Sequence, residues 1–180
     1  IFLPTMACMS AVAFRDLNDW PEGGLTDGRI WDIGAAWNQI HTGNYEYCTL
    51  LLIESNNIIV HHAILGVDVY DWGLLDQVVN QYEIKNIKMT YVISACPLWL
   101  AKYPDNPNYA PWLGPGSNSM PSDIDEFNKF VWNLSTRYAG RISTYEIWNE
   151  PQLADFLYPY NDEELDTLAN MTKRAYNTIK

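Results

Sequence analysis

Apolar residues follow two different spacings along this chain, and stretches with the two spacings alternate. Four short runs have the length and the Val, Ile, Tyr and Phe content of β-strands. Between and after them, apolar residues recur every three to four positions, which is the spacing of one helix face. The strand-like runs cover 11–14, 28–34, 87–95 and 142–147, and the helical stretches cover 71–82, 122–139 and 161–179. Strands that alternate with helices predict an α/β fold with a parallel sheet.

The ends of the predicted helices carry recognisable capping residues. Ser122 opens the second helix with Asp125 three residues later, a pattern typical of a capped N-terminus. Asn161 opens the last helix in the same way, with Glu164 at its third position. Gly140 follows the second helix, where glycine commonly ends a helix. These residues predict where the two helices begin and where the second one ends.

Residues 44–66 interrupt this alternation. They contain two apolar runs, Leu50–Ile53 and Ile58–Val60, separated by polar residues. The segment is compatible with a β-hairpin that protrudes from the domain. Both runs, however, lack the polar alternation of a half-exposed strand and would make an adhesive edge. We therefore expect an insert that adds no chemistry and stays outside the core of a single domain spanning 1–180.

One strand-like run ends on two polar residues that can carry chemistry. Asn149 and Glu150 follow the run at 142–147, and Pro151 closes it. Parallel α/β sheets bind their ligands at the carboxyl ends of the strands. An amide and a carboxylate at this position therefore predict a binding or catalytic site, and a plain Asn-Glu-Pro turn is the alternative. The tryptophans around the pair favour the site.

The segment Tyr145-Glu146-Ile147-Trp148-Asn149-Glu150-Pro151 resembles the fourth-strand signature of the clan A glycoside hydrolases, which are retaining (β/α)8 barrels. Within that clan it is most similar to family 39 and family-39-like enzymes, where Arg-Ile-Trp-Asp, here at 29–32, recurs on the second strand. The resemblance covers roughly 14–180 apart from the insert. It implies a partial TIM barrel of about the first four β/α units and a function in glycoside hydrolysis and carbohydrate metabolism.

The resemblance also implies roles for individual residues. In the clan, the glutamate after the asparagine is the general acid/base, and the asparagine hydrogen-bonds the sugar 2-hydroxyl, which points to Glu150 and Asn149. A second-strand arginine holds the nucleophile in these enzymes, and Arg29 is the candidate here. Since a cation inside a barrel must be paired, a surface position for Arg29 is the alternative. The expected substrate-binding residues are Asn149, Arg29, Trp31, Trp99 and Trp148.

A retaining glycosidase needs a second carboxylate about 5–5.5 Å from the first. In the clan this nucleophile comes from the seventh strand, and a chain of 180 residues is too short for a whole barrel of about 250 residues. Glu146 is not expected to replace it, because it lies roughly 13 Å from Glu150 along an extended strand. We therefore expect the chain alone to be inactive. A non-catalytic carbohydrate-binding fragment, a degenerate relic without the nucleophile, and a structural or interaction domain are the alternatives.

Composition narrows the choice of partners. The net charge of −11 argues against nucleic acid, whose binding relies on clustered Lys and Arg. Eight Trp and twelve Tyr suit an oligosaccharide or glycoside substrate, although most of them are expected in the core. No apolar run is long enough to span a bilayer. The three cysteines form no metal motif and are expected as small buried side chains; neither a metal nor another cofactor is expected. The compartment stays open, with secretion as one option suggested by the apolar residues 1–14.

Overall fold

The computed structural model describes residues 27–30, 36–54 and 57–180. Three of its strands form a parallel sheet in the order β1 (Asp27–Ile30), β4 (Lys88–Ile93) and β5 (Thr144–Ile147). The register places Arg29 beside Thr90, and Thr90 beside Thr144. These are three of the four predicted strands. The remaining one, the first in the chain at 11–14, lies outside the described residues. The α/β prediction is confirmed by a small parallel sheet joined through helices.

Three long helices follow the strands, and all three were predicted. They are α2 (Gly73–Ile84), α3 (Ile124–Arg137) and α4 (Asp162–Ile179). The Asn161 cap is confirmed, because its side chain accepts a hydrogen bond from the Glu164 N–H at 2.9 Å. The Ser122 cap is wrong by one residue. Asp123 is the N-cap and accepts from the Asp125 N–H, while the Ser122 hydroxyl donates to a loop carbonyl.

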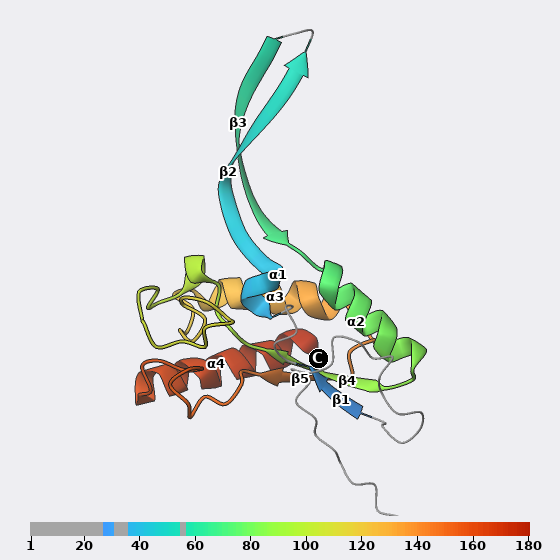
Figure 1. The fold of residues 1–180 in the computed structure, drawn as a ribbon, viewed down its shortest axis with the longest axis vertical. Coiled ribbons are helices and arrows are strands. Elements are labelled where there is room, and N and C mark those ends of the chain that lie inside the picture. The colour runs from blue at the N-terminus through green and yellow to red at the C-terminus, as the bar shows by residue number, and fades with distance from the viewer. Residues whose placement is uncertain (1–26, 31–35, 55–56) are drawn as a thin grey trace, which may run out of the picture.

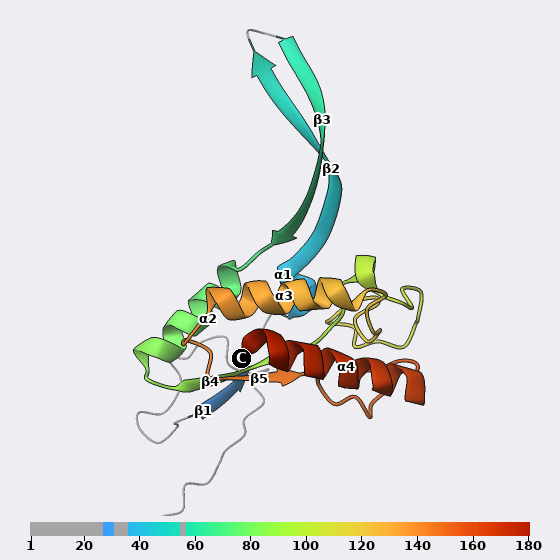
Figure 2. The same cartoon turned by 180° about the vertical axis from the view of Figure 1, so that it is seen from behind.

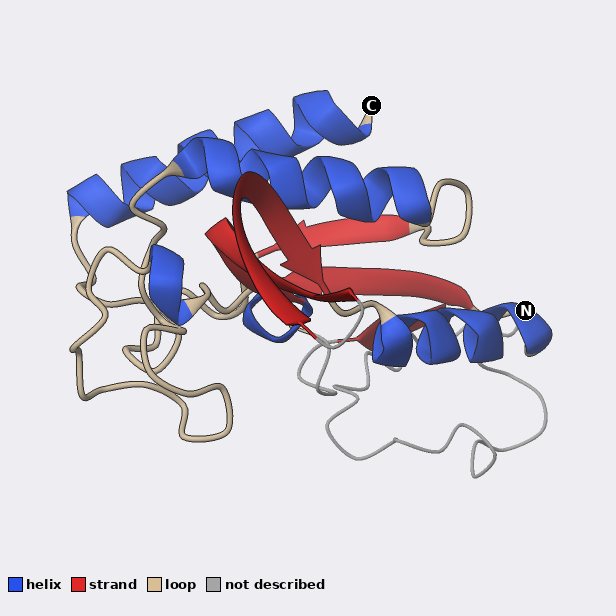
Figure 3. Ribbon diagram, turned by 90° about the horizontal axis from the view of Figure 1, so that it is seen from above, coloured by secondary structure: helices blue, strands red, loops and turns tan. Residues whose placement is uncertain are grey.

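The core lies between the helices and one face of the sheet. Helices α3 and α4 run side by side, as Figure 3 shows. Each helix contributes the apolar side chains that recur at helical spacing, and alternate residues of β4 contribute the rest. Fully buried examples are Leu75, Val79, Phe127, Phe130, Leu134, Met171, Met89, Tyr91 and Ile93. Most residues of the periodic stripes are therefore buried. Tyr176 of α4, whose helical spacing predicts a buried position, is instead 61% exposed.

The two faces of β4 have different surroundings. Met89, Tyr91 and Ile93 face the helices and are buried in the main core. Side chains alternate across a strand, so Thr90 and Val92 lie on the opposite face. A barrel of only four units is expected to leave inner-face residues such as Trp31, Tyr91, Ile93 and Trp148 partly uncovered. That prediction is wrong for Tyr91, Ile93 and Trp148, which are at most 2% exposed and belong to the main core, and Trp31 lies outside the described residues.

Residues 44–66 belong to a long antiparallel hairpin. Its strands are β2 (His41–Glu54) and β3 (Asn57–Tyr70), paired from His41 and Tyr70 to Glu54 and Asn57. Figures 1 and 2 show the hairpin extending away from the rest of the molecule, with its base at the short helix α1 (Trp37–Ile40). The segment is thus a protruding hairpin, the form with which its sequence is compatible.

Candidate active site

The candidate site begins where β5 ends. The Trp148 N–H donates to the Ile93 carbonyl at 2.8 Å, so the last strand contact lies one residue beyond Ile147. The backbone then turns sharply, with φ values of +71° at Trp148 and +39° at Glu150. Such values are unusual for side chains with a Cβ and persist only when surrounding contacts hold them. Asn149 sits between these two residues, at the carboxyl end of the parallel strands.

An arginine on β1 reaches across the central strand to this turn. The Arg29 guanidinium donates to both carboxylate oxygens of Glu146, from Nε and from Nη2, each at 2.7 Å. The same Nη2 donates to Asn149 Oδ1 at 2.8 Å. By its register, Arg29 lies on the sheet face opposite the main core, with Thr90 between the two strands. The pairing expected for an arginine inside a barrel is therefore present on that face.

Asn149 connects the arginine to the candidate acid/base. It is 1% exposed, and its Nδ2 donates to Glu150 Oε2 at 3.2 Å. Glu150 itself is exposed. A hydrogen-bonded chain thus runs from Glu146 through Arg29 and Asn149 to a solvent-accessible carboxylate. Of the residues predicted for the site, the structure brings Arg29, Asn149 and Glu150 together.

Glu146 is the residue that sequence reasoning left out of the site. It was set aside because an extended strand would place it roughly 13 Å from Glu150. The strand ends at Ile147, however, and the turn folds Asn149 back toward the same guanidinium. The period of two along a strand places Glu146 on the face opposite Tyr145 and Ile147, but only the register of the sheet shows that Arg29 lies on that same face.

The predicted tryptophans have separate positions. Trp148 is 2% exposed and its indole N–H donates to the Phe156 carbonyl at 2.6 Å, so the ring supports the turn from within. Trp99, in the 3-10 helix η3 (Leu98–Leu100), is 40% exposed and donates to the His41 carbonyl at 3.3 Å. Trp31 lies outside the described residues. Trp99 therefore keeps an accessible ring, at the end of β4 beside the base of the hairpin.

Two loops at this end of the sheet are tied to each other. Buried Asn118, in the long loop after β4, donates to the Ala154 carbonyl at 2.8 Å. The backbone carbonyl of Asn118 accepts a hydrogen bond from the Tyr158 N–H at 2.9 Å. Lys102 of the same loop pairs with the fully buried Glu164 of α4 at 2.7 Å. These contacts fix the loop that follows Glu150 and support the turn in which Glu150 lies.

Cys96 confirms the expectation for the one cysteine side chain that the structure describes. It is fully buried, and burial raises the pKa of its thiol, as expected for an unreactive core residue. The described ranges contain no group of three or more His, Cys, Asp or Glu side chains suited to hold a metal ion. Within those same ranges, no helix combines the length and apolar character needed to cross a membrane.

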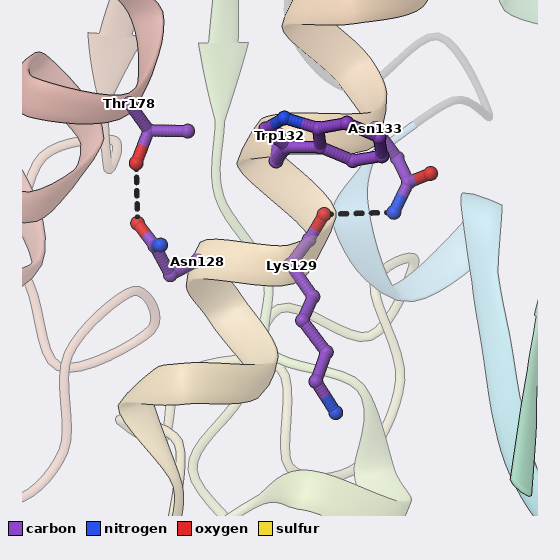
Figure 4. A pocket seen from close by; sticks show the side chains of 5 residues that line it. All are labelled: Asn128, Lys129, Trp132, Asn133 and Thr178. Carbon is purple, nitrogen blue, oxygen red and sulfur yellow. Dashed lines mark hydrogen bonds between the residues drawn. The ribbon is translucent and has the colours of Figure 1, made fainter.

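A separate cavity of roughly 470 Å³ lies on helices α3 and α4 and includes none of these residues. Figure 4 shows its lining, in which Thr178 donates to Asn128 and Asn133 donates to the Lys129 carbonyl. Trp132 borders this cavity and is 57% exposed. Because these groups come from the helix layer, the cavity does not extend the candidate active site.

Comparison with known proteins reveals likeness in structure. No protein-family model matches the sequence, and no curated protein matches it. A monomeric beta-xylosidase from Caulobacter crescentus CB15 is 23% identical, with a TM-score of 0.52 over 64% of this chain and 24% of its own. A GH39 beta-xylosidase from Caulobacter crescentus is 20% identical, with a TM-score of 0.50 over 72% of this chain and 28% of its own.

A third similar structure is the GH39 enzyme from Xanthomonas axonopodis pv. citri. It is 24% identical, with a TM-score of 0.52 over 64% of this chain and 23% of its own. This chain thus spans between 23% and 28% of the length of the three enzymes. The likeness shows that the α/β fold described above is shared with part of these three structures, two of which are GH39 enzymes.

Proposed function

We propose that this chain is the N-terminal part of a retaining glycoside hydrolase catalytic domain, built as the first four β/α units of a TIM barrel. Glu150 is its general acid/base. The observation that carries the proposal is the hydrogen-bonded chain from Arg29 through Asn149 to Glu150 at the carboxyl end of the parallel strands. The fold shared with part of two beta-xylosidases supports it.

The proposed chemistry assigns one task to each group. Glu150 is exposed and donates a proton to the leaving glycosidic oxygen. The Asn149 Nδ2 donates one hydrogen to Glu150. Its second hydrogen is proposed to be donated to the sugar 2-hydroxyl. A hydrogen bond to that hydroxyl strengthens as positive charge develops on the sugar ring. Trp99 offers an accessible ring for stacking against a sugar face, and Trp31 is proposed for the same wall.

The nucleophile is proposed to come from a later strand of a longer protein that carries this chain. Glu146 is not proposed as the nucleophile, because both of its carboxylate oxygens accept hydrogen bonds from the Arg29 guanidinium. That observation also favours the second candidate function, a carbohydrate-binding fragment without catalysis. Both functions place a sugar against Asn149 and Glu150, and they differ in whether bonds are broken.

Binding is tested on the isotope-labelled 180-residue chain, with xylobiose as the probe, because the similar structures include beta-xylosidases. The side-chain signals of Asn149 and Glu150 should shift on titration. The Glu150→Ala variant should lose most of the affinity. The matched control is Glu83→Ala, an exposed glutamate on α2 that pairs with Arg141. Unchanged Asn149 and Glu150 signals, or equal losses in both variants, would overturn the placement of the site.

Turnover separates the two functions. The 180-residue chain should not hydrolyse p-nitrophenyl β-xyloside, because it lacks the proposed nucleophile. In a longer protein that carries this chain, Glu150→Gln should slow a substrate with a poor leaving group far more than the activated aryl glycoside, which needs little protonation. Equal losses on both substrates would remove Glu150 from the acid/base role. A longer protein that binds sugar without turnover would establish the second candidate.

A further inference from the structure

The ion pair between Arg29 and Glu146 joins strands that are not neighbours. Arg29 lies on β1 and Glu146 on β5, and β4 runs between them. The Arg29 Nε and Nη2 each lie 2.7 Å from a carboxylate oxygen of Glu146. Two parallel hydrogen bonds of this kind are the most specific way in which arginine binds a carboxylate. The side chains of Arg29 and Glu146 are 18% and 41% exposed, so the pair is partly shielded from water. Besides its effect on stability, a pair with two parallel contacts fixes where the guanidinium lies.

We propose that Glu146 is a positioning residue, which holds the Arg29 guanidinium so that the Asn149 amide presents its Nδ2 to Glu150. The inference rests on the proposed function and adds a residue to its site. An asparagine amide can face either way, with its oxygen and nitrogen exchanging places. Arginine donates hydrogen bonds and accepts none. The Arg29 Nη2 therefore selects the orientation with Oδ1 toward itself, which leaves Nδ2 for Glu150.

Glu146 also decides what charge the site presents. The transition state of glycoside hydrolysis carries positive charge on the sugar ring. The positive charge of a guanidinium at 2.8 Å from Asn149 opposes that charge. Glu146 supplies the compensating negative charge on the same guanidinium. The pair can thus orient Asn149 without adding a net cation beside the sugar.

The turn after β5 is strained, and Glu146 acts on it through Arg29. Trp148 and Glu150 both have positive φ, a conformation that costs about 1–3 kcal/mol at a residue with a Cβ. Asn149 lies between them and is clamped on one side by Arg29 and on the other by Glu150. Without Glu146, the guanidinium loses the two hydrogen bonds that hold it from the β5 side. The amide is then free to reorient.

The experiment follows the Asn149 side-chain amide by NMR in the 180-residue chain, without any sugar. Glu146→Met removes both acceptors but keeps an unbranched side chain, and the matched control is Glu83→Met. Glu83 is held by Arg141 through a similar fork, with contacts of 2.8 and 2.6 Å. Glu146→Met should speed solvent exchange of the Asn149 Nδ2 hydrogens severalfold and change their shifts. Glu83→Met should leave both unchanged, while the two variants lose similar thermal stability.

A double-variant cycle shows whether Glu146 acts through the arginine. Arg29→Met should by itself produce the Asn149 amide change, and adding Glu146→Met should change the amide no further. An Asn149 amide unaffected by Glu146→Met, or effects of the two variants that simply add, would overturn the proposal. If the amide responds as expected but xylobiose does not bind, the positioning role stands and the proposed function fails.

Discussion

The α/β body and the β2–β3 hairpin are both rich in apolar residues, yet they contact the rest of the chain in different ways. In the body, β4, β5 and the helices pack side chains against elements distant in sequence. The hairpin strands pair with each other along their length and extend away from the body (Figure 1). The difference teaches that apolar content alone does not place a segment in the core. A matching spacing and a facing surface are also needed.

The two ends of the hairpin meet at its base. The Asp71 N–H donates to the Ile40 carbonyl at 2.8 Å, so the two ends of the excursion already meet. His41 is buried there, with its ring 4.5 Å from the Tyr70 ring and 4.8 Å from the Trp99 ring. This aromatic contact belongs to the body. Substitutions in the body and a deletion in the hairpin should therefore change stability by different amounts.

The largest effect is expected in the core of the body. Phe127 is fully buried on α3 and its ring lies 5.1 Å from that of Trp37. Phe127→Ala should lower the free energy of unfolding by about 3–5 kcal/mol, through lost burial and the cavity left behind. Urea denaturation followed by circular dichroism measures this change. The exposed Trp132 on the same helix gives the control, since Trp132→Ala should cost far less. Similar losses for the two variants would show that α3 does not bury the face described here.

A smaller effect is expected at low pH, where α2 meets α3. The side-chain hydrogen bond from Arg137 lowers the pKa of Asp76 below its ordinary value. A carboxylate with a lowered pKa in the folded state stabilises the protein above its unfolded pKa of about 3.9, and this contribution is lost as pH falls through the folded pKa. Asp76→Asn should therefore reduce stability at neutral pH by less than about 1 kcal/mol, since the pair is partly exposed.

The same substitution should also flatten the fall in stability below pH 4. Thermal unfolding of both proteins between pH 2 and 7 measures the difference. Asp105→Asn, in an exposed loop, is the control and should leave the pH profile of the unfolding temperature unchanged. Parallel profiles for the native chain and Asp76→Asn would show that this ion pair does not contribute to acid stability.

The smallest change in stability is expected from deletion of most of the hairpin. Joining Gly43 to Val67 removes most of the hairpin but keeps the contact between Ile40 and Asp71. The free energy of unfolding should stay the same or rise slightly, because a long excursion from the body is removed. Urea denaturation of the shortened chain tests this. A loss of several kcal/mol would show that the hairpin stabilises the body and would remove the contrast between the two regions.

The sequence alone predicted the elements of the body and the strand end that carries the candidate site. Helical and strand spacing is a local property, so α2, α3, α4, β4 and β5 could be read from 3.6- and two-residue periods. The Asn161 cap could be read in the same way, because its bond is to a residue three positions away. The Asn149-Glu150 pair at a strand end was also evident, since its position depends only on where the strand stops.

Tertiary structure alone decided which residues those elements bring together. The partners Arg29 and Glu146 are 117 residues apart, and no local pattern specifies such a pair. Whether Tyr91 faces the helices or the opposite side depends on strand register, because a shift of one residue exchanges the two faces. Trp148 is buried rather than open because the backbone turns directly after β5. Spacing along a chain fixes which side chains share a face, and only packing between elements fixes what that face meets.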